Sequence, residues 1–207
     1  MYLKEDDSKE VFMQKTNKMS TKTMVLGAVM TALVILIQLI STYTAFFGPF
    51  STALALIPIA IGAAMCGMGI GTWLGFIFGV VVLATGGAAL FFAFNIPGTV
   101  ITVLGKGAAC GFAAGLVYKL LKKFNLTVAA IVSAIVCPIV NTGVFLLGSA
   151  IFFLPSADQI AAKLGLGVSG MAVFWALAMA NFIFEISASI VLSPVIVRLL
   201  EIRKKQK

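Results

Sequence analysis

The sequence predicts an all-α integral membrane protein, a bundle of six transmembrane helices with both termini in the cytoplasm. Of the 207 residues, 61% are hydrophobic and only 11% are charged, and the mean hydropathy is +1.12. A soluble domain of this size could not cover so much apolar surface with polar groups. The apolar residues also form long runs almost free of charge, as membrane-spanning helices require. The basic residues, finally, are confined to a few segments between these runs.

Six apolar runs are expected to span the membrane. They cover approximately residues 24–41, 51–66, 69–85, 97–119, 126–154 and 169–198. Glycine and proline mark most junctions, and the short second and third runs are joined by the glycine-rich link CGMGIG. The fifth and sixth runs are longer than a bilayer requires, so they are expected to tilt or to extend beyond it.

The two ends of the chain are polar. Residues 1–23 carry mixed charge, and the first apolar run ends without a small-residue cleavage site, so it is expected to stay as an anchor and not to be a signal peptide. We therefore divide the chain into a cytoplasmic polar segment, a six-helix membrane domain and a cytoplasmic basic tail, covering residues 1–23, 24–200 and 201–207.

The positions of lysine and arginine predict the orientation. With the N-terminus inside, every basic residue except Lys106 and Lys163 falls on the inner side, as the positive-inside rule expects. The net charge of +8 is then a topology signal, and no nucleic-acid partner is expected. The localisation expected is the plasma membrane of a prokaryote, which the chain crosses several times.

Several kinds of chemistry are not expected of this chain. It has no histidine and three cysteines, all in or beside apolar runs, which favours neither a metal site nor a disulfide framework. It has no phosphate-binding loop and no room for a nucleotide-binding domain. We expect no catalytic residues and no cofactor, and uphill transport would need an ion gradient or a partner subunit.

Four polar residues within the spans are expected at one depth. Counting about 1.5 Å per residue from the basic helix ends places Lys106, Glu185 and Asn141 about 20–22 Å above the inner boundary. Asn181 lies one turn outward of Glu185 on the same helix face. Such groups should face the interior of the bundle, because exposure to lipid is costly.

Two interpretations of this layer stay open. One is a structural Lys106–Glu185 pair with asparagines bridging the helices. The other is a substrate pocket open to the outside, since ionisable residues within membranes are commonly functional. The aromatic stretches YTAFFGPF (43–50) and FFAFN (91–95) could cover such a pocket, with Asn95 as a loop contact, and Gly105 and Gly107 would leave room for a helix or ligand.

The first span carries small residues at helical spacing. Gly27, Ala28, Thr31 and Ala32 are expected on one face, which would let another helix approach closely. With the basic N-terminal segment, this Ala28-x-x-x-Ala32 pattern resembles the substrate-binding S component of energy-coupling factor (ECF) vitamin transporters. The stretches LALIPIAIGAAMCGMGIGTWLGFIFGVV (54–81), KGAACGFAAGLVYKLLKK (106–123) and PIVNTGVFLLG (138–148) resemble its riboflavin- and pantothenate-type branch.

The resemblance implies a division of labour. The chain would bind a water-soluble vitamin in an outward-facing pocket and would itself hydrolyse no ATP. It would dock, through Ala28 and Ala32 with Gly27 beside them, on a membrane-embedded coupling subunit attached to two cytoplasmic ATPases. Transport in the family is thought to involve toppling of the S component in the membrane.

The residues at the expected site favour pantothenate. Lys106 suits a carboxylate, Asn141, Asn181 and Glu185 suit hydroxyl and amide groups, and aromatic residues suit the gem-dimethyl group. Riboflavin gains if Glu185 neutralises Lys106, and folate and cobalamin stay open. A gradient-driven carrier, with the Lys106–Glu185 pair as an ion relay, and a structural membrane scaffold are the alternatives from other classes.

Overall fold

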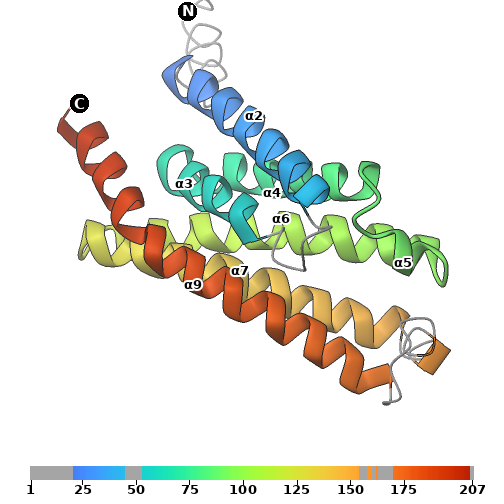
Figure 1. The fold of residues 1–207 in the computed structure, drawn as a ribbon. Helices are drawn as coiled ribbons and strands as arrows, with labels where there is room; N and C mark the ends of the chain where they lie inside the picture. Colours follow the sequence, from blue (N-terminus) through green and yellow to red (C-terminus); the bar gives the residue numbers. More distant parts are fainter. Residues whose placement is uncertain (1–20, 45–52, 154–157, 160–161, 163–169, 206–207) are drawn as a thin grey trace, which may run out of the picture.

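The computed structural model describes residues 21–44, 53–153, 158–159, 162 and 170–205, and in these residues all regular structure is helical. The elements, drawn in Figure 1, are α2 (Thr21–Thr44), η3 (Ala53–Ala55), α3 (Leu56–Cys66), α4 (Met68–Ala84), α5 (Ala89–Phe92), α6 (Ile96–Leu121), α7 (Leu126–Phe152) and α9 (Gly170–Lys205). The all-helical class predicted from the sequence is confirmed. α9 continues into the residues predicted as a tail, whereas residues 1–20 lie outside the described part.

Four of the described helices are long and apolar enough to cross a membrane. They are the Thr21–Thr42 part of α2, the whole of α6 and α7, and the Ala178–Ile202 part of α9. The other two long apolar runs form shorter helices, α3 with 11 residues and α4 with 17. At about 1.5 Å per residue, α3 is only about 17 Å long, which is much less than the hydrocarbon core thickness of about 30 Å.

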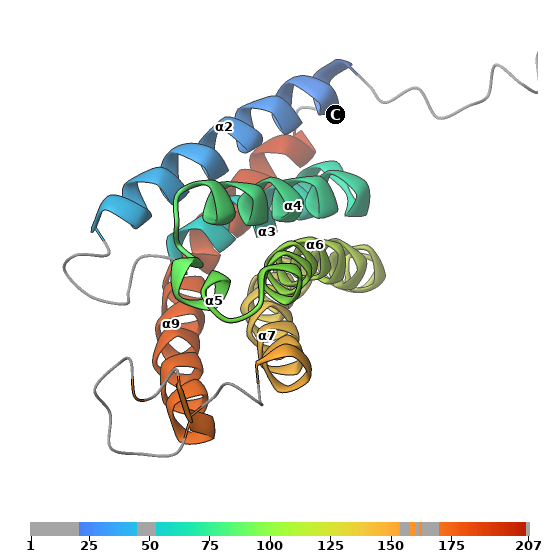
Figure 2. The same ribbon diagram turned by 90° about the vertical axis from the view of Figure 1, so that its right-hand side faces the viewer.

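The short helix α3 lies inside the bundle. It contacts α2, α4, α6, α7 and α9, and eight of its residues, from Leu56 to Ala64, are buried. The other helices pack around it in chain order, α2 on α4, α4 on α6, α6 on α7 and α7 on α9. Figure 2, which looks nearly along α6, shows this succession around the bundle.

The turn between α3 and α4 depends on glycine. Gly67 links the two helices with φ +98°, a left-handed conformation that other residues rarely adopt, and its amide donates to the carbonyl of Ala63. This glycine belongs to the CGMGIG link expected from the sequence. The reversal at Gly67 brings α4 back along α3.

Glycines also bring α4 and α6 into backbone contact. Gly71 and Gly75 on α4 face Gly111 and Gly107 on α6, and an ideal Cβ on Gly71 would lie 2.5 Å from the Gly111 carbonyl oxygen. A Cβ on Gly75 would overlap the carbonyl of Gly107. Lipid offers helices no hydrophobic drive to associate, so close approach through small residues is a main source of their packing energy. This contact fixes the inner part of α6, and therefore the height of Lys106.

Two helices contain an internal proline, Pro138 in α7 and Pro194 in α9. Proline removes one backbone donor, so Pro194 leaves the carbonyl of Ile190 without its helical partner. The Ser193 hydroxyl donates to that carbonyl at 2.8 Å. Within a membrane this replacement allows the helix to continue, and α9 bends in its C-terminal part in Figure 1.

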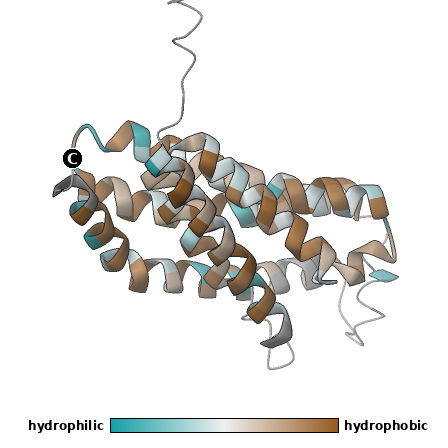
Figure 3. Ribbon diagram, turned by 90° about the horizontal axis from the view of Figure 1, so that it is seen from above, coloured by the Kyte–Doolittle hydropathy of each residue, from teal (hydrophilic) through white to brown (hydrophobic). Residues whose placement is uncertain are grey.

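Most residues along the helices are apolar, as the hydropathy colours of the ribbon in Figure 3 show. Large exposed side chains include Leu147, Ile151 and Val191, which are 65%, 70% and 73% exposed. The described basic side chains outside the spans gather at one end instead. The start of α2, the link between α6 and α7 and the end of α9 all lie toward the left of Figure 1 and carry Lys22, Lys119, Lys122, Lys123 and Arg198.

Candidate functional site

Lys106 lies in the middle of α6, and its ammonium lies over aromatic rings. Its Nζ is 5.3 Å from the centre of the Phe145 ring on α7 and 5.9 Å from that of Phe78 on α4. A cation over the face of an aromatic ring is stabilised by the ring quadrupole, and more strongly where water is excluded. No described residue places a carboxylate oxygen within 4.0 Å of this ammonium.

Glu185 on α9 is fully buried and hydrogen-bonded from two helices. It accepts a bond from Asn181 Nδ2 at 2.8 Å, one turn earlier on the same helix. From α7 it accepts bonds from Asn141 Nδ2 at 3.4 and 3.5 Å and from the Thr142 hydroxyl at 3.4 Å. The carboxylate therefore ties α7 to α9.

The register between α6 and α7 brings Lys106 opposite this cluster. The two helices run antiparallel, and their contacts include the bond from Ser133 to the Ala114 carbonyl, the adjacent thiols of Cys110 and Cys137, and Asn95 bonded to the Phe152 carbonyl. Each residue further along α6 is therefore paired with a residue one position earlier along α7. The same register places Lys106 across from Asn141, and Lys106 and Glu185 interact electrostatically.

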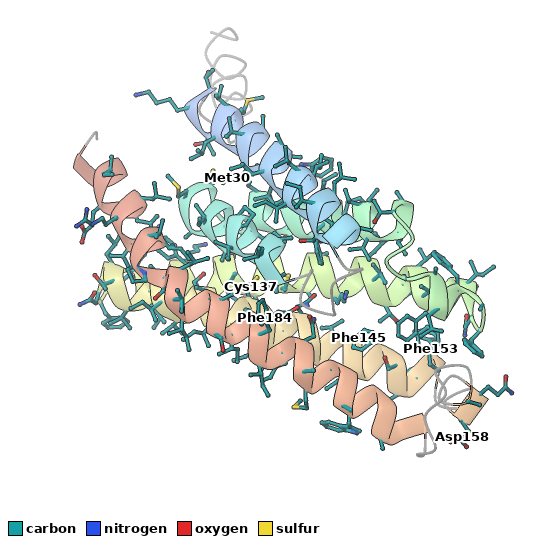
Figure 4. The ribbon with its side chains drawn as sticks, in the orientation of Figure 1. Met30, Cys137, Phe145, Phe153, Asp158 and Phe184 are labelled. Carbon is teal, nitrogen blue, oxygen red and sulfur yellow. The ribbon has the colours of Figure 1, made fainter. Side chains whose placement is uncertain are left out.

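Phe145 and Cys137 mark the two ends of this stretch of α7 in Figure 4. Phe145 lies one turn further along α7 than Asn141 and makes an edge-to-face contact with Phe91, the ring centres being 5.7 Å apart. Phe91 also packs on Phe153. An aromatic wall thus continues from the ammonium of Lys106 toward the end of the bundle away from the basic residues.

Some buried polar atoms of α2, α6 and α7 have no hydrogen-bond partner among the described residues. They are Asn141 Oδ1, Thr102 Oγ1 and Ser149 Oγ on α6 and α7, and Gln38 Oε1 on α2. Each of these side chains is at most 3% exposed. Buried polar atoms usually have partners, so such atoms indicate a place where water or a ligand can bind.

The structure brings together four of the five residues expected at the site. Asn141 and Asn181 both donate hydrogen bonds to Glu185. Lys106 is close enough to Glu185 for the two charges to interact. Asn95, the fifth expected residue, lies away from the other four. It is the N-cap of α6, accepts a bond from the Gly98 amide at 2.8 Å and donates to the Phe152 carbonyl at 3.4 Å, so its side chain satisfies backbone groups about 16 Å along the helix from Lys106.

The small residues of α2 divide between two faces. Ala28 and Ala32 are exposed, whereas Gly27 is buried against Ile70 of α4. The expected single face of small residues is therefore wrong for Gly27, because its backbone packs inside the bundle. Of the aromatic stretch 43–50, residues 45–50 lie outside the described part of the chain, and so does Lys163.

Sequence reasoning missed three residues that contact the cluster, Thr142, Phe145 and Phe78, and one buried amide on α2, Gln38. Thr142 follows Asn141, and Phe145 lies one turn further on the same helix face, so both could have been found from helical periodicity. Gln38 stands alone in the apolar stretch ILIQLI, is 2% exposed and donates to Thr42 at 3.4 Å. An isolated amide within a span is itself a signal. Phe78, by contrast, is one of seventeen phenylalanines, and nothing in the sequence sets it apart.

Among the described residues, no group of three or more Cys, Asp or Glu side chains could hold a metal ion. Cys66, Cys110 and Cys137 are not joined by disulfide bonds. The arrangement offers instead a cation, amide groups and aromatic rings within one layer of the bundle, which are the kinds of group that line small-molecule sites.

Comparison with known proteins identifies the family. The model of the family described as ECF transporter, substrate-specific component, matches residues 22–197. The chain belongs to this family. The resemblance seen in the sequence is confirmed at this level, while no curated protein and no solved structure matches the chain.

Membership in this family defines the general role of the chain. A substrate-specific component is the substrate-binding subunit of a transporter and not an enzyme, and it associates with ECF membrane and ATPase subunits. With four helices able to span a bilayer, this substrate-specific component is a multi-pass membrane protein. The cluster around Lys106 and Glu185 lies within the matched residues.

Proposed function

We propose that this substrate-specific component binds pantothenate with high affinity at the layer formed by Lys106, Asn141, Asn181 and Glu185. The observation that carries this proposal is the environment of Lys106. Its ammonium lies 5.3 and 5.9 Å from the centres of two phenylalanine rings and has no ion pair with a described carboxylate. A buried cation in this setting gains most from an anionic group that a ligand brings.

The hydrogen bonds of Glu185 favour a charged over a neutral vitamin. Two amides and a hydroxyl already stabilise this carboxylate, so it does not depend on Lys106 as its main partner. Lys106 can then meet the carboxylate of pantothenate, while Phe145 and Phe78 contact its gem-dimethyl group. Asn141 and Asn181 suit its amide and hydroxyl groups.

Riboflavin is the second candidate, and the aromatic wall favours it. Phe91 contacts both Phe145 and Phe153, and such rings could stack on a flavin. Riboflavin bears no anionic group, however, and would leave the Lys106 ammonium without an anion. We therefore place pantothenate first.

The proposed assembly follows from the family and from the surface. We propose that the exposed positions Ala28 and Ala32 of α2 dock on the membrane-embedded coupling subunit, which carries two cytoplasmic ATPases. Close helix contact in a membrane favours small residues, which supports this face. Membrane insertion would place α2, α3, α4, α6, α7 and α9 as the six-helix bundle of a prokaryotic plasma membrane.

The proposed orientation puts both termini in the cytoplasm. The described basic residues at the helix ends gather at one end of the bundle, and lysine and arginine are enriched in cytoplasmic loops. The layer around Lys106 then lies toward the outer half of the membrane, where a substrate from outside could reach it.

Reconstitution into vesicles tests the functional class. Vesicles containing this chain alone should bind radiolabelled pantothenate without accumulating it, under a proton or sodium gradient as well. Vesicles that also contain the coupling subunit and both ATPases, supplied with ATP, should accumulate it. Gradient-driven accumulation by the chain alone would instead support the carrier alternative, in which Lys106 and Glu185 relay an ion.

A further inference from the structure

The hydrogen bonds around Glu185 fix the orientation of the Asn141 amide. The carboxyl oxygens of Glu185 already accept hydrogen bonds from Asn181 and Thr142, so an amide that faces the same oxygens presents its NH2 group. Asn141 Nδ2 contacts both carboxylate oxygens, at 3.4 and 3.5 Å. The amide oxygen of Asn141 must then point away from Glu185.

That oxygen is buried and has no donor in the described part of the chain. Asn141 as a whole is 3% exposed, so bulk water does not solvate its side chain freely. A buried acceptor without a donor is unfavourable, and the deficit is removed when a ligand supplies an N–H or O–H group. The register of α6 and α7 puts Asn141 across from Lys106.

We propose that Asn141 Oδ1 accepts a hydrogen bond from the substrate, and that Glu185 is a positioning residue that orients this amide without touching the substrate. The inference rests on the proposed function, because it assumes that an anionic group of the substrate meets Lys106. It narrows the substrate class to molecules in which a short chain separates a carboxylate from an N–H or O–H donor. The amide N–H of pantothenate, separated from the carboxylate by methylene groups, has this arrangement.

Two probes of equal charge separate the donor from the anion. One is pantothenate, and the other is its tertiary amide analogue, in which a methyl group replaces the amide hydrogen. The carboxylates of both probes should contact Lys106 in the same way. The ratio of the two dissociation constants, measured by calorimetry in detergent, therefore reports the contribution of the amide N–H donor. For the unmodified chain we expect pantothenate to bind about tenfold more tightly or better, since the analogue leaves a buried acceptor unpaired.

Asn141→Leu tests the acceptor, and Ser187→Ala is its control. Asn141→Leu should weaken binding of both probes and bring their ratio close to one. Ser187→Ala removes an exposed hydroxyl that donates to the Ile183 carbonyl of its own helix, α9, so it should keep the preference. A full preference in Asn141→Leu, or none in the unmodified chain, would overturn the inference.

Glu185→Gln tests positioning and also serves if Asn141→Leu does not fold. The glutamine is isosteric but can donate as well as accept, so Asn141 is free to turn its amide over, and the ratio should fall to about threefold or less. A purely structural role of Glu185 would change both affinities and leave their ratio unchanged, which would refute the positioning role. If the unmodified chain binds no pantothenate at all, the proposed vitamin fails and this inference fails with it, an outcome distinct from binding without discrimination.

Discussion

The Nζ atom of Lys106 lies 5.3 Å from the centre of the Phe145 ring, and this cation has no ion pair with any described carboxylate. If it receives the carboxylate of the substrate, Lys106→Met should weaken pantothenate binding by about 2–5 kcal/mol, the scale of unpairing a buried charge. Methionine keeps the length and apolar packing of the lysine stem. Calorimetry on the purified chain measures the change.

The control for this substitution lies on the same helix. Lys119→Met removes an exposed lysine from the last turn of α6, and it should leave the affinity for pantothenate unchanged. If both variants bind like the unmodified chain, direct contact between Lys106 and the substrate is excluded.

The glycine contact between α4 and α6 predicts a sharp difference between two alanine substitutions. Gly75→Ala places a methyl group against the Gly107 carbonyl and should lower the stability by about 1–3 kcal/mol through overpacking. Gly105→Ala, on α6, meets no atom within 4 Å and should be neutral, or stabilising by up to about 1 kcal/mol through helix propensity. Thermal unfolding in detergent distinguishes them, and equal midpoints would contradict the described packing.

The exposed alanines of α2 give a prediction about assembly. Ala28→Trp and Ala32→Trp should leave pantothenate binding intact but abolish uptake in vesicles with the coupling subunit and ATPases, because bulk on this face prevents close helix contact. Val191→Trp, at an apolar position that is 73% exposed on α9, is the matched control and should transport normally. Loss of vitamin binding with normal assembly would refute the docking role of α2.

The sequence predicted heights along the helices better than the directions of side chains. Rise per residue is constant, so counting from the basic ends was sufficient to place Asn141, Asn181 and Glu185 at one level, where they are hydrogen-bonded. The direction in which a side chain points from its helix could not be predicted in this way. In a soluble protein the apolar face of a helix points inward, but these helices are apolar on all sides, since lipid is as apolar as the core.

Three examples show which features of side-chain direction and helix packing could not be predicted from the sequence. Gly27 and Ala28 are neighbours of similar size, and only the packing of α2 on α4 separates the buried glycine from the exposed alanine. Asn95 is polar and close to the loop, yet it caps a helix. The central place of α3 could not be predicted either, because its contacts with five other helices depend on residues far away in the sequence.

The most direct test of the central claim is mass spectrometry of the small molecules that co-purify with the chain. The unmodified chain should carry a carboxylate-bearing vitamin, with pantothenate expected, and Lys106→Met purified in parallel should carry much less of it. A neutral ligand, such as a flavin that colours the protein yellow, or a carboxylate ligand retained equally by Lys106→Met, would contradict the account.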